Sequence, residues 1–449
     1  MVEQSTKVKG VMKHVVKAVL AAGLSGFVAM ASAALPIERW STPQGARVVF
    51  MRAPAIPMVD VQIDFDAGSR REPATHTGLA SFTVAMLDKA AAGLKENEIE
   101  DALADVGAKL SGSAGSDRLS VSLRTLTSQP EMGRALDVMA KVLHKPEFPA
   151  DILERERARS IAAIRESKTK PEAIGHEMLS SLMYGDHPYG RTASEETVKR
   201  IAVDDLKRFY ADNFAAGRAV VSIVGDVTRE QASDIAQRLV AGLPAGVQPA
   251  ALPELQAPIA MEKRIAHPST QSHVMIGMPA MKRGDPDFFP LVVGNYILGG
   301  GGFVSRLMTE VREKRGLAYS AYAYFSPMSQ LGPFEMGLQT QREQTDTALK
   351  VARDTLFEFL STGPTEAELK AAKSNLVGGF PLRLDSNRKL LDQISTIGYF
   401  RLPDDYLDTW TRNIEAVTVA QVKDAFSRRV KPENLITVIV GQGEVPLAK

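Results

Sequence analysis

The chain of 449 residues contains no cysteine, which excludes several kinds of chemistry. Without thiols it can form no disulfide, no thiolate metal site and no cysteine nucleophile. It also has almost no net charge, +1 at neutral pH, and so offers no electrostatic basis for binding nucleic acid. The hydrophobic fraction of 44% and the charged fraction of 24% are typical of a soluble globular protein, and the length predicts more than one domain.

An apolar run near the N-terminus has the form of a secretory signal. Several lysines precede the apolar residues 18–30, and Ala31-Ser32-Ala33 fits a small-x-small cleavage site. Residues 1–33 are therefore predicted to be a signal peptide, which sends the mature chain to the periplasm with no stable insertion into the membrane. An uncleaved anchor is the alternative, but the run is short for a bilayer span.

The rest of the chain repeats one pattern twice. Residues 203–210 (VDDLKRFY) match residues 419–426 (VAQVKDAF), and residues 220–225 (VVSIVG) match residues 436–441 (ITVIVG), both at an offset of 216. A fixed register across a helix and a strand indicates a duplication. The sequence therefore predicts two related α+β domains, each with a mostly antiparallel sheet covered by helices.

The stretch 241–258 is rich in proline, alanine and glycine with almost no charge, which is typical of a linker. It separates a predicted N-terminal domain, 34–240, from a C-terminal domain, 259–449. In the first domain the hydrophobic periodicity predicts strands at 47–51, 59–65, 117–126 and 219–224, and helices at 78–89, 96–106, 129–143, 150–167, 171–183 and 203–213.

The stretch 298–324, LGGGGFVSRLMTEVREKRGLAYSAYAY, is the most informative part of the chain. Its periodicity predicts a helix over 305–314, which Gly316 ends, and an aromatic strand over 317–325. Arg312 in the last helical turn and Tyr319 early in the strand can then project from one corner of the fold. From spacing alone, a solvated helix-end cation and a half-buried strand aromatic are the simpler interpretation.

This stretch, within a duplicated α+β chain, resembles the pitrilysin/insulinase-type zinc peptidases, the inverzincins. That family carries a glycine-rich turn, then S-R-L, then E-x-R-E-K-R-G-L-A-Y, and the same order occurs here from Gly299 to Tyr319. The resemblance covers essentially the whole mature chain. It implies two half-shells around a cavity, and it implies that Arg312 and Tyr319 hold the substrate backbone.

The residues that form the metal site of that family are absent from the first domain. The family places H-x-x-E-H on a helix, two histidines for zinc and a glutamate as base. The framework GLA and ML is present at 78–87, but Ser81, Val84 and Ala85 occupy the His, Glu and His positions, and Ala163 occupies the position of the third ligand. Valine and alanine have no lone pair for a metal, and serine is a poor zinc ligand.

No other set of residues replaces this site. The histidines outside the predicted signal are each expected in a loop or at the surface, and no two are three to five positions apart: His76, His144, His176, His187, His267 and His273. There is no G-x-S-x-G motif, and the four glycines are not followed by the Lys-Ser/Thr of a phosphate loop, so close backbone approach or flexibility explains them better.

The resemblance therefore implies a non-catalytic subunit of a heteromeric periplasmic zinc peptidase. Such a chain holds no cofactor itself, and zinc is expected in a homologous partner that retains H-x-x-E-H. Arg312 and Tyr319 would bind peptide substrate in the partner's site. The alternatives are a peptidase-derived binding or scaffold subunit with no proteolytic role, and a self-sufficient enzyme with a relocated metal site.

Overall fold

The computed structural model describes residues 36–441, and one compact unit begins at Ile37. The predicted signal peptide at residues 1–33 lies outside the described residues and stays a prediction. No helix within residues 36–441 is both long enough and apolar enough to cross a bilayer.

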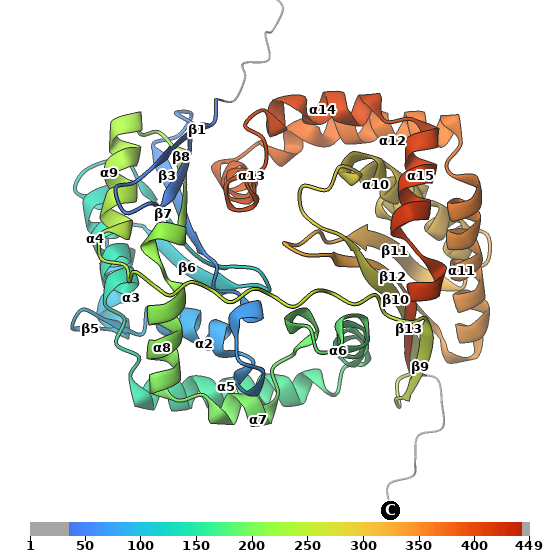
Figure 1. The fold of residues 1–449 in the computed structure, drawn as a ribbon, viewed down its shortest axis with the longest axis horizontal. Coiled ribbons are helices and arrows are strands. Elements are labelled where there is room, and N and C mark those ends of the chain that lie inside the picture. The colour runs from blue at the N-terminus through green and yellow to red at the C-terminus, as the bar shows by residue number, and fades with distance from the viewer. Residues whose placement is uncertain (1–35, 442–449) are drawn as a thin grey trace, which may run out of the picture. The chain divides into compact units, whose positions relative to one another are not determined.

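The first half of the chain forms a six-stranded sheet in the order β1-β2-β8-β3-β7-β6 (Figure 1). All neighbouring strands are antiparallel except β2 and β8. In β7 apolar residues alternate with polar ones, so one face of this strand enters the hydrophobic core and its other face carries polar side chains. The strands are β1 (Glu38–Ser41), β2 (Arg47–Arg52), β3 (Met58–Phe65), β6 (Lys109–Ala114), β7 (Leu119–Leu126) and β8 (Val220–Gly225).

The second half forms a five-stranded sheet in the order β11-β12-β10-β13-β9, with β13 and β9 as its parallel pair. This is the order of the first sheet without β1, so the predicted fold of two related, mostly antiparallel α+β halves is confirmed. The strands are β9 (Met261–Ala266), β10 (Gln271–Met281), β11 (Ala318–Phe325), β12 (Gly332–Gln341) and β13 (Ile436–Gly441).

The repeat predicted at an offset of 216 holds for the 3₁₀ turns Ala216–Arg218 and Pro432–Asn434 and for four pairs of α-helices and strands, whose first residues all differ by that number. The pairs are α5 (Ala150–Ser167) with α12 (Glu366–Gly379), α6 (Pro171–Tyr184) with α13 (Asn387–Phe400), α8 (Val203–Asn213) with α15 (Val419–Arg429), and β8 with β13. The other α-helices are α2 (Leu79–Met86), α3 (Glu96–Ala104), α4 (Glu131–His144), α7 (Glu195–Arg200), α9 (Arg229–Val240), α10 (Phe288–Asn295), α11 (Thr345–Thr362) and α14 (Tyr406–Ala416).

The paired helices α6 and α13 each cover the sheet of the opposite half. Leu179 and Met183 of α6 share a buried cluster with Met275 of β10 and Val438 of β13. Helix α13 packs against β2, β3 and β8, beside which it lies in Figure 1. The two halves therefore complete each other's sheets, and neither sheet is covered by its own half alone.

The ends of these two helices follow local rules. Pro171 occupies the first turn of α6, and Ser386 caps α13 by accepting a hydrogen bond from the Lys389 N–H. Both helices end in a residue with positive φ, Gly185 at +53° and Arg401 at +54°. Arg401, with ψ of +42°, lies in the left-handed αL region, where arginine has a steric cost that glycine lacks.

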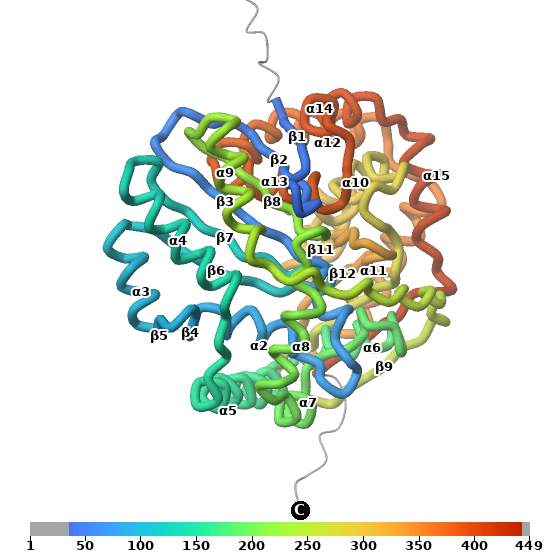
Figure 2. Tube along the Cα trace, turned by 60° about the vertical axis from the view of Figure 1, so that its left-hand side comes forward, coloured from blue at the N-terminus to red at the C-terminus, as the bar shows by residue number. Residues whose placement is uncertain are grey.

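The predicted linker 241–258 contains no helix or strand and runs as an extended segment from α9 to β9 (Figure 1 and Figure 2). It is held against the protein, because the carbonyl oxygens of Ala250 and Pro253 accept hydrogen bonds from Arg71 and Gln330. The domain boundaries at 34–240 and 259–449 stay predictions.

Candidate functional site

Arg312 lies on a helix of an unexpected kind. A helix is present within the predicted range 305–314, but over Met308–Glu313 it is a π-helix, with wider turns than an α-helix. The helix ends as predicted near Gly316, which has φ of +61°. The wider turn alters the direction in which each side chain leaves the helix, and such π-turns are frequent at functional sites.

Tyr319 lies on β11, the edge strand of the second sheet. The pairing of β11 with β12 shifts between Ala318 and Ala321, where three steps along β11 oppose two along β12. This bulge takes Tyr319 and Ser320 out of the regular ladder, and both side chains are exposed. The expected half-buried aromatic is therefore wrong: Tyr319 is 83% exposed.

The two residues meet, as their spacing predicted. The Arg312 guanidinium carbon lies 4.9 Å from the ring centre of Tyr319 and 4.7 Å from that of Phe303. These cation–π contacts with two aromatic rings hold the guanidinium in place while leaving its N–H groups available.

An open pocket of about 610 Å³ lies in front of this pair. Three glycines contribute to its wall, and a Cβ on Gly299 would lie 2.4 Å from the backbone N of Ala323, so the chain can come this close only as glycine. Phe303, 64% exposed, lies at the same pocket. The predicted close backbone approach at the glycines is thus confirmed.

The polar groups of Arg312 and Tyr319 have no polar partner within the described part of the chain. Within residues 36–441 neither side chain forms a hydrogen bond or an ion pair. The neighbouring charged side chains, by contrast, are paired with one another, since Glu310 forms ion pairs with Lys314 and with Arg315, both at 2.6 Å. Arg312 therefore presents a full set of donors to an outside acceptor.

The four degenerate metal positions lie on two helices that pack together, α2 and α5. Ser81 and Ala85 are exposed one turn apart on α2, and Ala163 is exposed on α5. Val84 is half-buried beneath β6, where a Cβ on Gly112 would lie 2.3 Å from its side chain. One hydroxyl and three hydrocarbon side chains do not make a zinc site, so the residues present do not fit the metal.

Glu72 fixes the start of the helix that carries three of these positions. Its two carboxylate oxygens accept hydrogen bonds from the N–H groups of Gly78 and Ala80, at 2.9 and 2.7 Å. Burial is the main influence on this side chain and raises its pKa to about 7, although the two N–H donors act in the opposite direction.

The histidines do not assemble a substitute site. Among residues 36–441 no group of three or more His, Cys, Asp or Glu side chains is arranged to hold a metal. Each histidine is expected from the sequence to lie in a loop or at the surface. His187 lies in a loop, although it is only 5% exposed, and the side chain of His176 on α6 is 39% exposed. His144 in α4 and His273 in β10 depart from the expectation, since both lie in regular elements and are partly buried.

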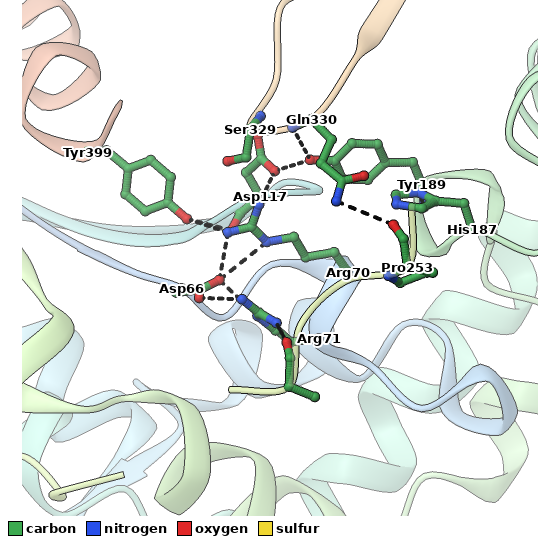
Figure 3. A network of polar contacts seen from close by, with 11 residues as sticks. Asp66, Arg70, Arg71, Asp117, His187, Tyr189, Pro253, Ser329, Gln330 and Tyr399 are labelled. Atoms are coloured by element: carbon green, nitrogen blue, oxygen red, sulfur yellow. Dashed lines mark hydrogen bonds and ion pairs between the residues drawn. The ribbon is translucent and has the colours of Figure 1, made fainter. Parts of the chain in front are cut away.

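A buried polar network, which the sequence did not reveal, joins the two halves (Figure 3). Arg70 lies between two carboxylates, 2.8 Å from Asp66 and 2.7 Å from Asp117. Asp117 also accepts the backbone N–H of Ser329 at 2.8 Å, and the Tyr399 hydroxyl of α13 donates to its carbonyl oxygen at 2.7 Å. The network secures the contact of α13 with the first sheet.

Comparison with known proteins places the chain in a family. The family model for insulinase, peptidase family M16, matches residues 47–196, and the model for the peptidase M16 inactive domain matches residues 200–376. The crystal structure of a peptidase M16 inactive domain from Pseudomonas fluorescens is 36% identical, covers 92% of this chain and 99% of its own, and superposes with a TM-score of 0.88. The chain belongs to peptidase family M16. The resemblance seen in the sequence is thereby confirmed.

Curated M16 relatives carry two kinds of name. The uncharacterized zinc protease YmxG of Bacillus subtilis is 24% identical over 416 residues, which is 91% of this chain and 100% of the relative. The non-peptidase homolog YmxG of Helicobacter pylori is 24% identical over 398 residues, 88% of this chain and 91% of the relative.

Proposed function

We propose that this M16 chain is the non-catalytic subunit of a heteromeric periplasmic zinc peptidase. Arg312 and Tyr319 would bind the peptide substrate at the zinc site of a homologous partner that carries H-x-x-E-H. The observation that carries the proposal is the state of this pair: its donors are positioned by two aromatic contacts and a strand bulge, yet have no acceptor among residues 36–441.

The chemistry of the two side chains suits a peptide under attack. A guanidinium and a phenol can both donate to a peptide carbonyl and to the oxyanion that this carbonyl becomes. Tyr319 stands on an edge strand, and an extended peptide can pair with the free edge of a sheet. A chain that served only as a scaffold would have no use for both residues in this arrangement.

The other half of the catalytic machinery must come from another chain. Ser81, Val84, Ala85 and Ala163 supply neither zinc ligands nor a general base. A relative named as a non-peptidase homolog supports a non-catalytic role, and the match to the M16 inactive domain agrees with it.

Reconstitution tests the proposal. The chain is purified alone and together with an H-x-x-E-H homologue from the same genome, and zinc content and peptide cleavage are measured for each. We expect no stoichiometric zinc and no cleavage by the single chain, and cleavage when both are present. A partner variant with glutamine in place of its catalytic glutamate serves as the control and should abolish the activity of the pair.

Two results would contradict the proposal. Stoichiometric zinc with cleavage by the single chain would show a relocated metal site. A partner whose activity is the same with and without this chain would leave it a binding or scaffold subunit.

A further inference from the structure

A second pocket, of about 340 Å³, lies where α13 meets the first sheet. Its wall includes Arg47 at the start of β2, Arg218 at the end of the 3₁₀ turn Ala216–Arg218, and Arg401 at the end of α13. Both halves of the chain therefore contribute to it, and it is separate from the pocket of Arg312 and Tyr319.

Four guanidinium groups and one carboxylate line this pocket. The carboxylate, Asp66, is already neutralised, because it accepts from Arg70 at 2.8 Å and from Arg71 at 2.6 Å. Arg70 is likewise neutralised by Asp66 and Asp117. The positive charge of the other three arginines is left without compensation.

The hydrogen bonds of these three arginines confirm this. Arg47 donates to the carbonyl oxygen of Gly398 at 2.7 Å, and Arg218 donates to that of Asp212 at 3.2 Å. The Nε of Arg218 is buried with no acceptor. Within residues 36–441 none of the three is paired with a carboxylate, and the side chain of Arg401 has no hydrogen-bond partner.

Burial and the nearby cations Arg401 and Arg39 lower the pKa of Arg47. The positive charges of Arg47, Arg218 and Arg401 therefore repel one another, and an anion bound between the guanidinium groups would reduce this repulsion.

The duplication supplies an internal comparison for this site. In the second half, β9 pairs with β13 as β2 pairs with β8, so Met261 corresponds to Arg47. The offset of 216 assigns Asn434 to Arg218 and Gly185 to Arg401. The equivalent place on the second sheet, where α6 packs, therefore has none of the three charges.

Arg401 is the most telling of these differences. It ends α13 with φ of +54°, while its counterpart Gly185 ends α6 with φ of +53°. The two helices nevertheless end in different backbone conformations, because Gly185 has ψ of −127° whereas Arg401 has ψ of +42° and lies in the left-handed αL region. Arginine is sterically disfavoured in this conformation, so the fold gains no local stability from having it there.

We infer that this pocket binds a small multivalent anion bearing phosphate or carboxylate groups, held by Arg47, Arg218 and Arg401. Guanidinium groups bind both kinds of oxyanion through paired N–H donors. The volume is at the lower end of the range for ligand pockets, which suits a small anion. A bound anion would bridge the first sheet and α13 and would stabilise the contact between the halves.

Thermal unfolding and calorimetry with defined anions test the inference. The whole chain is titrated with sodium pyrophosphate and, separately, with sodium citrate, while sodium chloride keeps the ionic strength constant. Three variants carry the residue of the second half: Arg401→Gly, Arg47→Met and Arg218→Asn. Arg412→Ala removes an exposed arginine from α14, outside the pocket, as the matched control.

We expect a saturable rise in Tm and measurable binding for the wild type and for Arg412→Ala. In each of the other three variants the affinity for the anion should fall by about tenfold or more, the loss expected for one charge-assisted hydrogen bond. Arg401→Gly should be at least as stable as the wild type without ligand, so its loss of binding cannot be ascribed to misfolding.

The two anions distinguish the ligand class. Saturation with pyrophosphate alone indicates a phosphate compound, and saturation with citrate alone indicates a carboxylate. The inference is overturned if neither anion saturates, or if Arg401→Gly and Arg47→Met respond as the wild type does.

Discussion

Replacing Gly398 by alanine should weaken the contact between α13 and the first sheet. The α-carbon of Gly398 faces two valines, and an added Cβ would lie 2.6 Å from Cγ2 of Val49 and 3.0 Å from Cγ1 of Val220. Both valines are fully buried on neighbouring strands, and a β-branched side chain has no flexible end that could move aside. The sheet or the helix must therefore shift.

The size of the effect follows from two opposing contributions. Overpacking a well-filled interior typically costs about 1–3 kcal/mol. Alanine in place of glycine favours the helix by about 1 kcal/mol. Gly398→Ala should therefore be neutral to destabilising by about 2 kcal/mol.

Two other helical glycines serve as controls. Gly378, near the end of α12, has nothing within 4 Å of an added Cβ, so Gly378→Ala should stabilise by up to about 1 kcal/mol. Gly175 of α6 would meet the sulfur of Met275 at 2.8 Å, but this side chain is flexible and can move. Gly175→Ala should therefore fall between the other two.

Urea unfolding followed by circular dichroism gives the order of stability, and hydrogen exchange of the α13 amides locates the change. The expected order is Gly378→Ala above Gly175→Ala above Gly398→Ala, with faster exchange in α13 only in the last. If Gly398→Ala were as stable as Gly378→Ala, α13 could not lie on β2 and β8 as described.

Two further predictions concern buried charges. Burial raises the pKa of Glu72 to about 7 from 4.5, so the folded chain binds this proton more tightly than the unfolded chain. This stabilisation is present below pH 4.5 and is lost as the pH rises through 7. Between pH 5 and 8 the free energy of unfolding of the wild type should therefore fall by about 1–3 kcal/mol relative to that of Glu72→Gln. Parallel curves of stability against pH for the two proteins would contradict this. Asp117→Ala removes one of the two carboxylates that flank buried Arg70, as well as the acceptor of the Ser329 N–H, and should cost about 3–5 kcal/mol in urea unfolding. Asp117→Asn keeps an acceptor and should cost less, and equal losses would argue against the network.

Much of the fold could be predicted from the sequence because it depends on local periodicity. The repeat at an offset of 216 identified α15 and β13 from α8 and β8 before any contact was known. Alternation likewise located β3 and β7. The helix predicted over 78–89 is shorter, because α2 ends at Met86 and the chain turns into a short hairpin at Ala90.

The candidate site could be predicted only in part. The motif located Arg312 and Tyr319, but their orientation depends on a π-helix and a strand bulge. Both irregularities are set by packing and by the partner strand, which local propensity does not report. The network around Arg70 was also invisible, since its contact with Tyr399 spans 329 positions of the chain.

The role of Arg312 in a partner's active site is the central claim, and one comparison of rates tests it most directly. The reconstituted pair is assayed for kcat/KM on an unstructured peptide with Arg312→Ala and with Arg315→Ala. Arg315 is an exposed arginine of the same segment, already paired with Glu310 at 2.6 Å. We predict that Arg312→Ala lowers kcat/KM by about 10- to 100-fold, the loss of a charge-assisted hydrogen bond to the substrate. Arg315→Ala should leave the rate unchanged. Full activity of Arg312→Ala would contradict the account.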